Sequence, residues 1–364
     1  MKTIRKTIIY YVQRYRPAYE AISKEVAQLQ NHFANRYNIA NKYHTQYNVT
    51  IHDLHLDGIG NFTFQKKMKS YHFILYPLLA LHTHLASRKS AINHIYTSLG
   101  DLPYLSVLNL KNTILTAAAS SGYAKIKKRK SKLKKMRKII VESERQKKQL
   151  LSIGINEQKI EIIYPPVDLD QFSYARPRGK FTVLYASCPT RESDFEKRGI
   201  PLILDTAKKS PSVQFHLAWR GGGYPKIQEL IKRLMRTTGG KNVTAKNEII
   251  TDMNLLYGSA HCTIIPYTKY DDFLKLIPNS ALESLASGKP LLVSSKTEIA
   301  RIVETEQCGV VFEPTPEGLS KAVRRLQQNY AAYQKNCRKT AEKYFSKKVF
   351  LQKYETIYEQ ILNK

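Results

Sequence analysis

The chain has 364 residues, enough for two domains, and 42% of them are hydrophobic, which excludes a disordered chain. Its net charge of +30 implies an anionic partner such as a membrane surface, nucleic acid or a phosphorylated ligand. The four cysteines lack metal-ligand spacing and are expected to be reduced, buried thiols. The N-terminus is not typical of a secretory signal, and no apolar stretch reaches the ~20 residues that a membrane span needs, so we expect a cytoplasmic protein.

The N-terminal half alternates apolar strands with helices. Strands are predicted at residues 6–12, 48–54, 94–97, 112–118 and 138–143, and helices at 18–33, 71–86 and 144–151. This order favours a parallel sheet covered by helices. The loop after the first strand carries Arg14, Arg16, Tyr19 and Glu20, which would contact an acceptor or a phosphate, or would form a basic surface loop. His94 is a further acceptor-side candidate, although a lone histidine is more often structural.

The stretch from residue 125 to 138 is the sharpest compositional feature, because ten of its fourteen residues are basic. A helix here would carry cations on most faces, with Ile126, Leu133 and Met136 as a thin apolar stripe. Each well-placed cation near anionic lipid contributes about 1 kcal/mol. Nucleic acid is a less favoured partner, because no aromatic residues are interleaved with the lysines. A third interpretation is a solvated basic face with no partner. We predict membrane binding by six residues that we call the basic cluster: Lys127, Lys128, Arg129, Lys130, Lys134 and Lys135.

Pro165 and Pro166 form a semi-rigid connector after a strand at residues 159–164, so we place a domain boundary near Tyr164. The second half then starts with a strand at 181–187, a loop at 188–199 and a helix at 200–208, followed by strands at 213–219 and 261–266. Gly221 and Gly222 follow a strand, where they let a ligand approach the backbone or simply form a turn.

Residues 276–294, LIPNSALESLASGKPLLVS, combine a turn, a short helix, a second turn and a buried strand. Pro278, Asn279 and Ser280 are turn and cap residues before the helix predicted at 281–287. Gly288 suits the left-handed position that ends a helix. Glu283 lies inside this helix, and its spacing alone fits a surface glutamate as well as a functional carboxylate.

The segment LESLASGKPLLVS resembles the nucleotide-sugar motif of retaining family-4 glycosyltransferases, which belong to the glycosyl transferases group 1. In that family the glutamate matching Glu283 accepts hydrogen bonds from the ribose hydroxyls of the donor. The segment Pro278–Ser280 would line the donor phosphates through its backbone. The family's first acidic residue, which contacts the donor sugar, is replaced here by Lys275, a departure that suits an anionic sugar such as a uronic acid.

This resemblance implies the α/β fold called GT-B, with two Rossmann-like domains facing each other across a cleft. The domains would be an acceptor-binding part at residues 1–163 and a nucleotide-sugar-binding part at 164–345, and a C-terminal helix at 346–364 would cross back to the first. Family members bind the donor phosphates with cations in the loop at 188–199. The matching residues are Arg191, Arg198 and Lys197, which would stabilise the departing diphosphate, or would be a charged surface loop.

The resemblance further implies sugar transfer from a UDP- or GDP-linked donor, with retention, to a lipid-linked or surface-glycan acceptor at the cytosolic face of a membrane. Neither a metal nor a cofactor is expected. A catalytically degenerate GT-B protein that binds sugar, nucleotide or nucleic acid is the alternative, favoured by Lys275 and by Ala118–Ser121, where many relatives carry a histidine. A nucleotide-sugar processing enzyme or phosphorylase is another alternative on the same fold.

Overall fold

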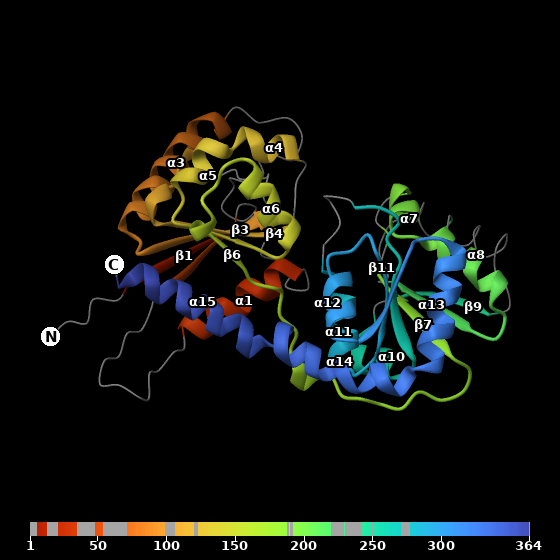
Figure 1. Cartoon of the computed structure of the whole chain (residues 1–364). Coiled ribbons are helices and arrows are strands. Elements are labelled where there is room, and N and C mark those ends of the chain that lie inside the picture. The colour runs from red at the N-terminus through yellow and green to blue at the C-terminus, as the bar shows by residue number, and fades with distance from the viewer. Residues whose placement is uncertain are drawn as a thin grey trace, which may run out of the picture. The chain divides into compact units, whose positions relative to one another are not determined.

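The structure of the chain, a computed structural model, divides into two compact units (Figure 1). It describes residues 6–12, 21–34, 48–53, 71–98, 106–119, 123–187, 189, 192–219, 229, 242–248, 250–270 and 277–363. Unit 1 runs through Pro165 and resumes at Phe350, and unit 2 takes the described residues between Pro166 and Val349. The division therefore falls at the proline pair, beside the predicted boundary near Tyr164.

Unit 1 is built on a parallel six-stranded sheet with the strand order β2-β1-β3-β4-β5-β6. Its strands are β1 Thr7–Val12, β2 Asn48–Asp53, β3 Ile92–Ser98, β4 Thr113–Ala119, β5 Lys138–Val141 and β6 Ile160–Ile162. Strands such as β1 and β5 are apolar on both faces, as expected where helices cover both sides of a parallel sheet.

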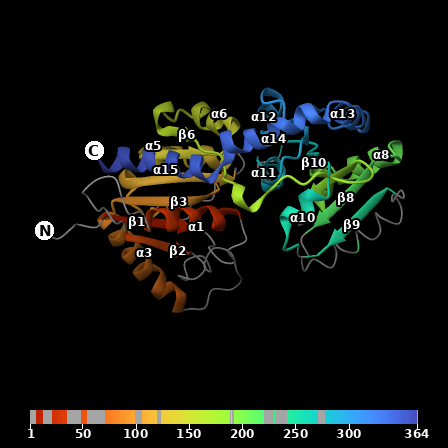
Figure 2. The ribbon, with the colours of Figure 1, turned by 90° about the horizontal axis from the view of Figure 1, so that it is seen from below.

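Helices cover both faces of this sheet (Figures 1 and 2). They are α1 Ala21–Ala34, α3 Tyr71–Lys89, α4 Tyr123–Lys128, α5 Lys130–Lys135, α6 Glu144–Ser152 and α15 Lys347–Leu362. Apolar residues of α4, α5 and α6 pack with Ile9, Leu115 and Ile139 on one face. On the other face α1 and the part of α15 from Phe350 onward form a second core with Ile8.

The basic stretch differs from the single helix predicted for it. It forms two short helices, α4 and α5, which are separated at Arg129. Ile126, Leu133 and Met136 have exposed fractions of 0% and belong to the core of unit 1. The predicted apolar stripe is therefore used for packing inside the protein, and the residues of the basic cluster are exposed around it.

Unit 2 has a second parallel six-stranded sheet, with the order β12-β11-β10-β7-β8-β9. Its strands are β7 Thr182–Ala186, β8 Gln214–Trp219, β9 Val243–Asn247, β10 Cys262–Ile265, β11 Leu291–Ser294 and β12 Gly309–Phe312. Two parallel sheets with flanking helices confirm the predicted α/β class and its two-domain organisation.

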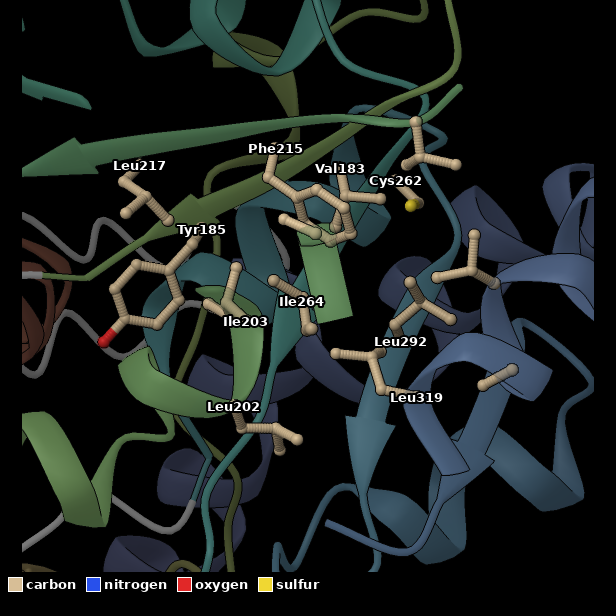
Figure 3. Close-up of a cluster of buried hydrophobic side chains, with 14 of the residues drawn as sticks. Val183, Tyr185, Leu202, Ile203, Phe215, Leu217, Cys262, Ile264, Leu292 and Leu319 are labelled. Atoms are coloured by element: carbon tan, nitrogen blue, oxygen red, sulfur yellow. The ribbon is translucent and has the colours of Figure 1, made fainter. Parts of the chain in front are cut away.

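The helices of unit 2 are α7 Ser193–Lys197, α8 Ile200–Lys209, α10 Met253–Gly258, α11 Asn279–Ala286, α12 Ala300–Thr305, α13 Pro316–Gln328 and α14 Tyr330–Phe345. Helices α8 and α13 pack their apolar residues, including Ile203 and Leu319, on one face of the sheet. Figure 3 shows this core, where Val183, Phe215 and Ile264 of three neighbouring strands meet those helices. The packed sheet is a rigid base for the loops at its strand ends.

Two local predictions in unit 2 need correction. The loop predicted at 188–199 contains the five-residue helix α7. Helix α11 begins at Asn279, with Pro278 as its N-cap and no side-chain cap bond, so Asn279 and Ser280 lie in its first turn rather than capping it. Gly288 has a φ of +67°, which matches the left-handed position predicted for it.

The described cysteines Cys262, Cys308 and Cys337 are free and buried, and burial raises the thiol pKa of Cys308 to about 12. Across the ranges that the structure describes, we find no helix with the length and apolarity needed to cross a membrane.

Candidate functional site

The candidate site lies at the carboxyl ends of β7 and β10, two neighbouring parallel strands at the centre of the sheet of unit 2. The chain leaves β7 toward β8 on one side and later places β10 on the other side, so the order of strands reverses at this pair. Open parallel sheets bind ligands outside the carboxyl ends of their strands at such a reversal, because the following loops diverge there. This topology selects the loops after β7 and β10 as the candidate site.

The loop after β7 is held directly against the end of β10. The backbone N–H of Thr268 donates to the carbonyl of Lys197 over 3.1 Å, and the Thr268 hydroxyl donates to the carbonyl of Glu196 over 2.9 Å. Gly199 has a φ of +71°, and a Cβ built on it would lie 2.0 Å from the carbonyl oxygen of Pro266. Only glycine combines this backbone conformation with this close approach.

Lys197 and Arg198, two of the predicted phosphate-binding cations, therefore lie at the end of β7 as expected from the sequence. Lys197 ends helix α7 and Arg198 is its C-cap. The Nη1 of Arg198 donates to the hydroxyl of Ser187, directly after β7, over 2.5 Å. This bond directs the guanidinium toward the carboxyl end of the strand.

Helix α11 follows β10 and carries Glu283, the predicted ribose ligand. Its buried face includes Ala281, Leu282 and Leu285, whereas Glu283 is half-buried. The phenolic hydroxyl of Tyr257, on helix α10, donates to Oε2 of Glu283 over 2.8 Å. The carboxylate is thus an ordered group at the edge of the site and not a mobile surface side chain.

Buried Lys289 and half-buried Arg338 anchor the elements around α11. The ammonium of Lys289, whose exposed fraction is 0%, donates to the carbonyls of Ala175 and Gly258 over 2.5 and 3.2 Å, and burial lowers its pKa to about 8. The Nη1 of Arg338 donates to the carbonyls of Phe172 and Ala286 over 2.8 and 2.7 Å. Because Ala286 is the last residue of α11, Arg338 satisfies a terminal carbonyl of that helix.

Several predicted site residues lie outside the described residues. They are Arg14, Arg16, Tyr19, Glu20, Arg191, Gly221, Gly222 and Lys275. Pro278, Asn279 and Ser280 are described and form the N-terminal end of α11.

His94 is placed in the core of unit 1, with an exposed fraction of 0%. Its Nδ1 and Nε2 are hydrogen-bonded to the hydroxyls of Tyr358 and Thr116 at 2.5 and 2.7 Å. Burial lowers its pKa to about 3, so the ring is neutral at physiological pH. This environment fits the structural interpretation and not acceptor contact, because both ring nitrogens are engaged inside the protein.

The six residues of the basic cluster are all exposed. Neighbouring cations outside the cluster have partners, for example Lys132 on Ser106 and Lys138 on Glu161. Within the described part of the chain, none of the six is paired with a carboxylate. Their positive field therefore faces solvent largely uncompensated.

Tyr257, Lys289 and Arg338 were not predicted from the sequence. Tyr257 is 26 residues from its partner Glu283, and no local pattern connects them. Lys289 did carry a signal, because a lysine between a left-handed glycine and a buried strand must find partners for its ammonium.

A family model described as "Glycosyl transferases group 1" matches residues 189–329, which include Lys197, Arg198 and all of α11. No curated protein matches the chain. No group of three or more His, Cys, Asp or Glu side chains able to hold a metal ion occurs among the described residues.

Solved structures match almost the whole chain. A glycosyltransferase from Rickettsia africae has a TM-score of 0.75 at 17% identity, over 99% of this chain and 100% of that one. Sucrose-phosphate synthase from Thermosynechococcus elongatus has a TM-score of 0.71 at 15% identity, over 98% and 100%. The Anabaena protein HepE in complex with UDP-glucose has 0.71 at 14%, over 96% and 99%. These likenesses show the GT-B fold, and the family match supports a glycosyltransferase.

Proposed function

We propose that the chain is a retaining, metal-independent glycosyltransferase that takes a sugar from a UDP- or GDP-linked donor. The observation that carries this proposal is the arrangement at the reversal of strand order in unit 2, where Lys197 and Arg198 follow β7 and helix α11, which follows β10, carries Glu283. These three residues also lie within the part of the chain that matches the family model. The structure of HepE with UDP-glucose supports a nucleotide-sugar as the donor.

The proposed chemistry follows from the charges at the site. Glu283 accepts hydrogen bonds from the ribose hydroxyls and so orients the nucleotide. As the bond between the anomeric carbon and the diphosphate breaks, negative charge grows on the leaving oxygen. Lys197 and Arg198, joined by Arg191, stabilise that charge more than they stabilise the intact donor, which lowers the barrier. Lys275 would accept an anionic sugar, and Lys275→Glu should then change the donor preference.

A thermal-shift screen with UDP, GDP, ADP and CMP tests the donor site. A nucleotide at 100 times its dissociation constant stabilises the folded state by about 2.7 kcal/mol. One nucleotide should stabilise the wild type but not Glu283→Ala. Glu304→Ala removes an exposed carboxylate from α12 of the same unit and should retain the shift. If no nucleotide raises the thermal stability of the wild type, the chain is better described as a GT-B protein that has lost catalysis.

We further propose that the acceptor is a lipid-linked or surface glycan, reached at the cytosolic face of a membrane through the basic cluster. Because Ile126, Leu133 and Met136 are buried, the attraction must be electrostatic rather than by insertion of α4 or α5. Such binding weakens as added salt shortens the Debye length, which is about 10 Å at 0.1 M.

Sedimentation with vesicles tests this interface. The test variant neutralises four cluster residues to glutamine: Lys127, Lys128, Lys134 and Lys135. The matched control makes the same change at four exposed lysines of unit 2: Lys321, Lys335, Lys339 and Lys348. Only the test variant should lose binding to anionic vesicles. Equal loss in both variants, or equal binding of the wild type to neutral vesicles, contradicts a dedicated membrane surface, and tighter binding to RNA than to vesicles would favour a nucleic-acid partner.

A further inference from the structure

Tyr257 lies outside the predicted site and contacts one of its residues directly. Its side chain has an exposed fraction of 0%, and its hydroxyl donates to Oε2 of Glu283 over 2.8 Å. A buried phenol needs a partner for its hydroxyl, and here the partner is the carboxylate to which we assign the ribose. Because the donor is a neutral hydroxyl, it orients the carboxylate without cancelling its charge.

Tyr257 is itself rigidly held. Asp252 is the N-cap of helix α10, and its carboxylate accepts a hydrogen bond from the backbone N–H of Leu255 over 2.8 Å. Directly after Tyr257, the carbonyl of Gly258 accepts a hydrogen bond from buried Lys289. The position of the phenol is therefore set at both ends of the helix.

A second connection joins Tyr257 to the helix that carries Glu283. The tyrosine ring packs edge-to-face on Phe172, with ring centroids 6.1 Å apart. Arg338 binds the carbonyl of Phe172 and also that of Ala286, the last residue of α11. Arg338 thus connects Phe172, on which Tyr257 packs, to helix α11, which carries Glu283. The fold therefore fixes the distance between Tyr257 and Glu283.

We propose that Tyr257 is a positioning residue for nucleotide binding, which fixes the carboxylate of Glu283 in the orientation that receives the ribose hydroxyls. This inference rests on the proposed function, because it needs Glu283 to bind the ribose. A glutamate has many rotamers, and ordering one on binding lowers affinity by an amount that corresponds to between about twofold and tenfold. A carboxylate oriented in advance avoids that loss.

The test is Tyr257→Phe, which removes one oxygen and keeps the buried ring. Titration calorimetry would compare UDP and GDP with their 2′,3′-dideoxy forms on the wild type, Tyr257→Phe and Glu283→Ala. Tyr330→Phe is the matched control, because it removes a hydroxyl of the same unit that donates to the carbonyl of His261 over 3.1 Å.

We expect Tyr257→Phe to bind the preferred ribonucleotide between about twofold and tenfold more weakly, with unchanged affinity for its dideoxy form. The control should bind both as the wild type does. If Tyr257→Phe weakened the binding of the ribonucleotide and its dideoxy form equally, the effect would be a general structural one and the inference would be overturned. The inference would also be overturned if Tyr257→Phe kept the full preference for ribose while Glu283→Ala lost that preference. If Glu283→Ala keeps the ribose preference, the assigned role of Glu283 fails first and the inference fails with it.

Discussion

Replacing Gly199 by alanine should destabilise unit 2 through two separable effects. The first is conformational, because a φ of +71° costs an alanine roughly 1–2 kcal/mol relative to glycine. The second is steric, because the new Cβ would lie 2.0 Å from the oxygen and 3.0 Å from the carbon of the Pro266 carbonyl. Neither backbone can yield without moving the loop after β7 from the end of β10, so we add about 1–3 kcal/mol for overpacking.

Gly179 isolates the two contributions. It lies in the same unit with a φ of +79°, and a Cβ built on it meets nothing within 4 Å. Gly179→Ala should therefore lose only the conformational part, about 1–2 kcal/mol, whereas Gly199→Ala should lose both parts, about 2–5 kcal/mol in the free energy of unfolding.

The single tryptophan of the chain provides the assay. Trp219 ends β8 in unit 2 and has an exposed fraction of 2%, so its fluorescence in urea follows the unfolding of that unit. Equal losses for the two alanine variants, within about 0.5 kcal/mol, would refute the close approach at Pro266. If a nucleotide still raises the thermal stability of Gly199→Ala, nucleotide binding does not depend on the exact position of the loop that carries Arg198.

Three further variants test other contacts. His94 has a native pKa of about 3 against 6.5 when exposed, so between these values the unfolded state binds one more proton and wild-type stability falls as the pH drops. The stability of His94→Gln, measured by circular dichroism, should fall less steeply with pH. An unchanged slope would contradict a neutral ring. Lys289 has a native pKa of about 8 against 10.5 in the unfolded state, so between these values the unfolded state again binds one more proton and stability rises with pH. Lys289→Met should lack this rise in stability when unfolding is followed by Trp219 fluorescence. A variant that keeps the rise would contradict the lowered pKa. Arg338→Met should cost about 1.5–3 kcal/mol by urea unfolding, because it removes charged hydrogen bonds to two carbonyls; exposed Arg324→Met is the control, and equal losses would be the contrary result.

Periodicity and turn chemistry predicted most elements because these signals are local. The strand at 291–293, the left-handed Gly288 and the apolar faces of the helices all follow from neighbouring residues. Helix α7 was missed because its five residues contain one apolar side chain, Phe195, which is 4% exposed and packs edge-to-face on Trp219 from a distant strand. A single apolar residue gives no helical periodicity, so no local signal predicted this helix.

The same distinction separates what could be predicted of the site. Glu283 could be found because its motif is continuous in sequence. Tyr257 could not, because its bond to Glu283 exists only once α10 and α11 are packed in the same unit. The break at Arg129 could not be predicted either, because Ile126 and Leu133 are seven residues apart and would lie on one face of an unbroken helix as well.

The return of α15 to unit 1 has a consequence for the order in which the chain can fold during synthesis. Phe350, Tyr354 and Tyr358 belong to the same core as Ile8, and the hydroxyl of Tyr358 donates to that of Tyr10 across 348 residues. Unit 2 lies between these two segments in the sequence. The residues of its core, from Val183 to Tyr333, are all synthesised before Phe350. The second unit in sequence can therefore complete its fold first. The first unit stays without one helix of its core until the ribosome has passed residue 358, so a chain stalled before that point leaves the face of its sheet beside α1 partly exposed.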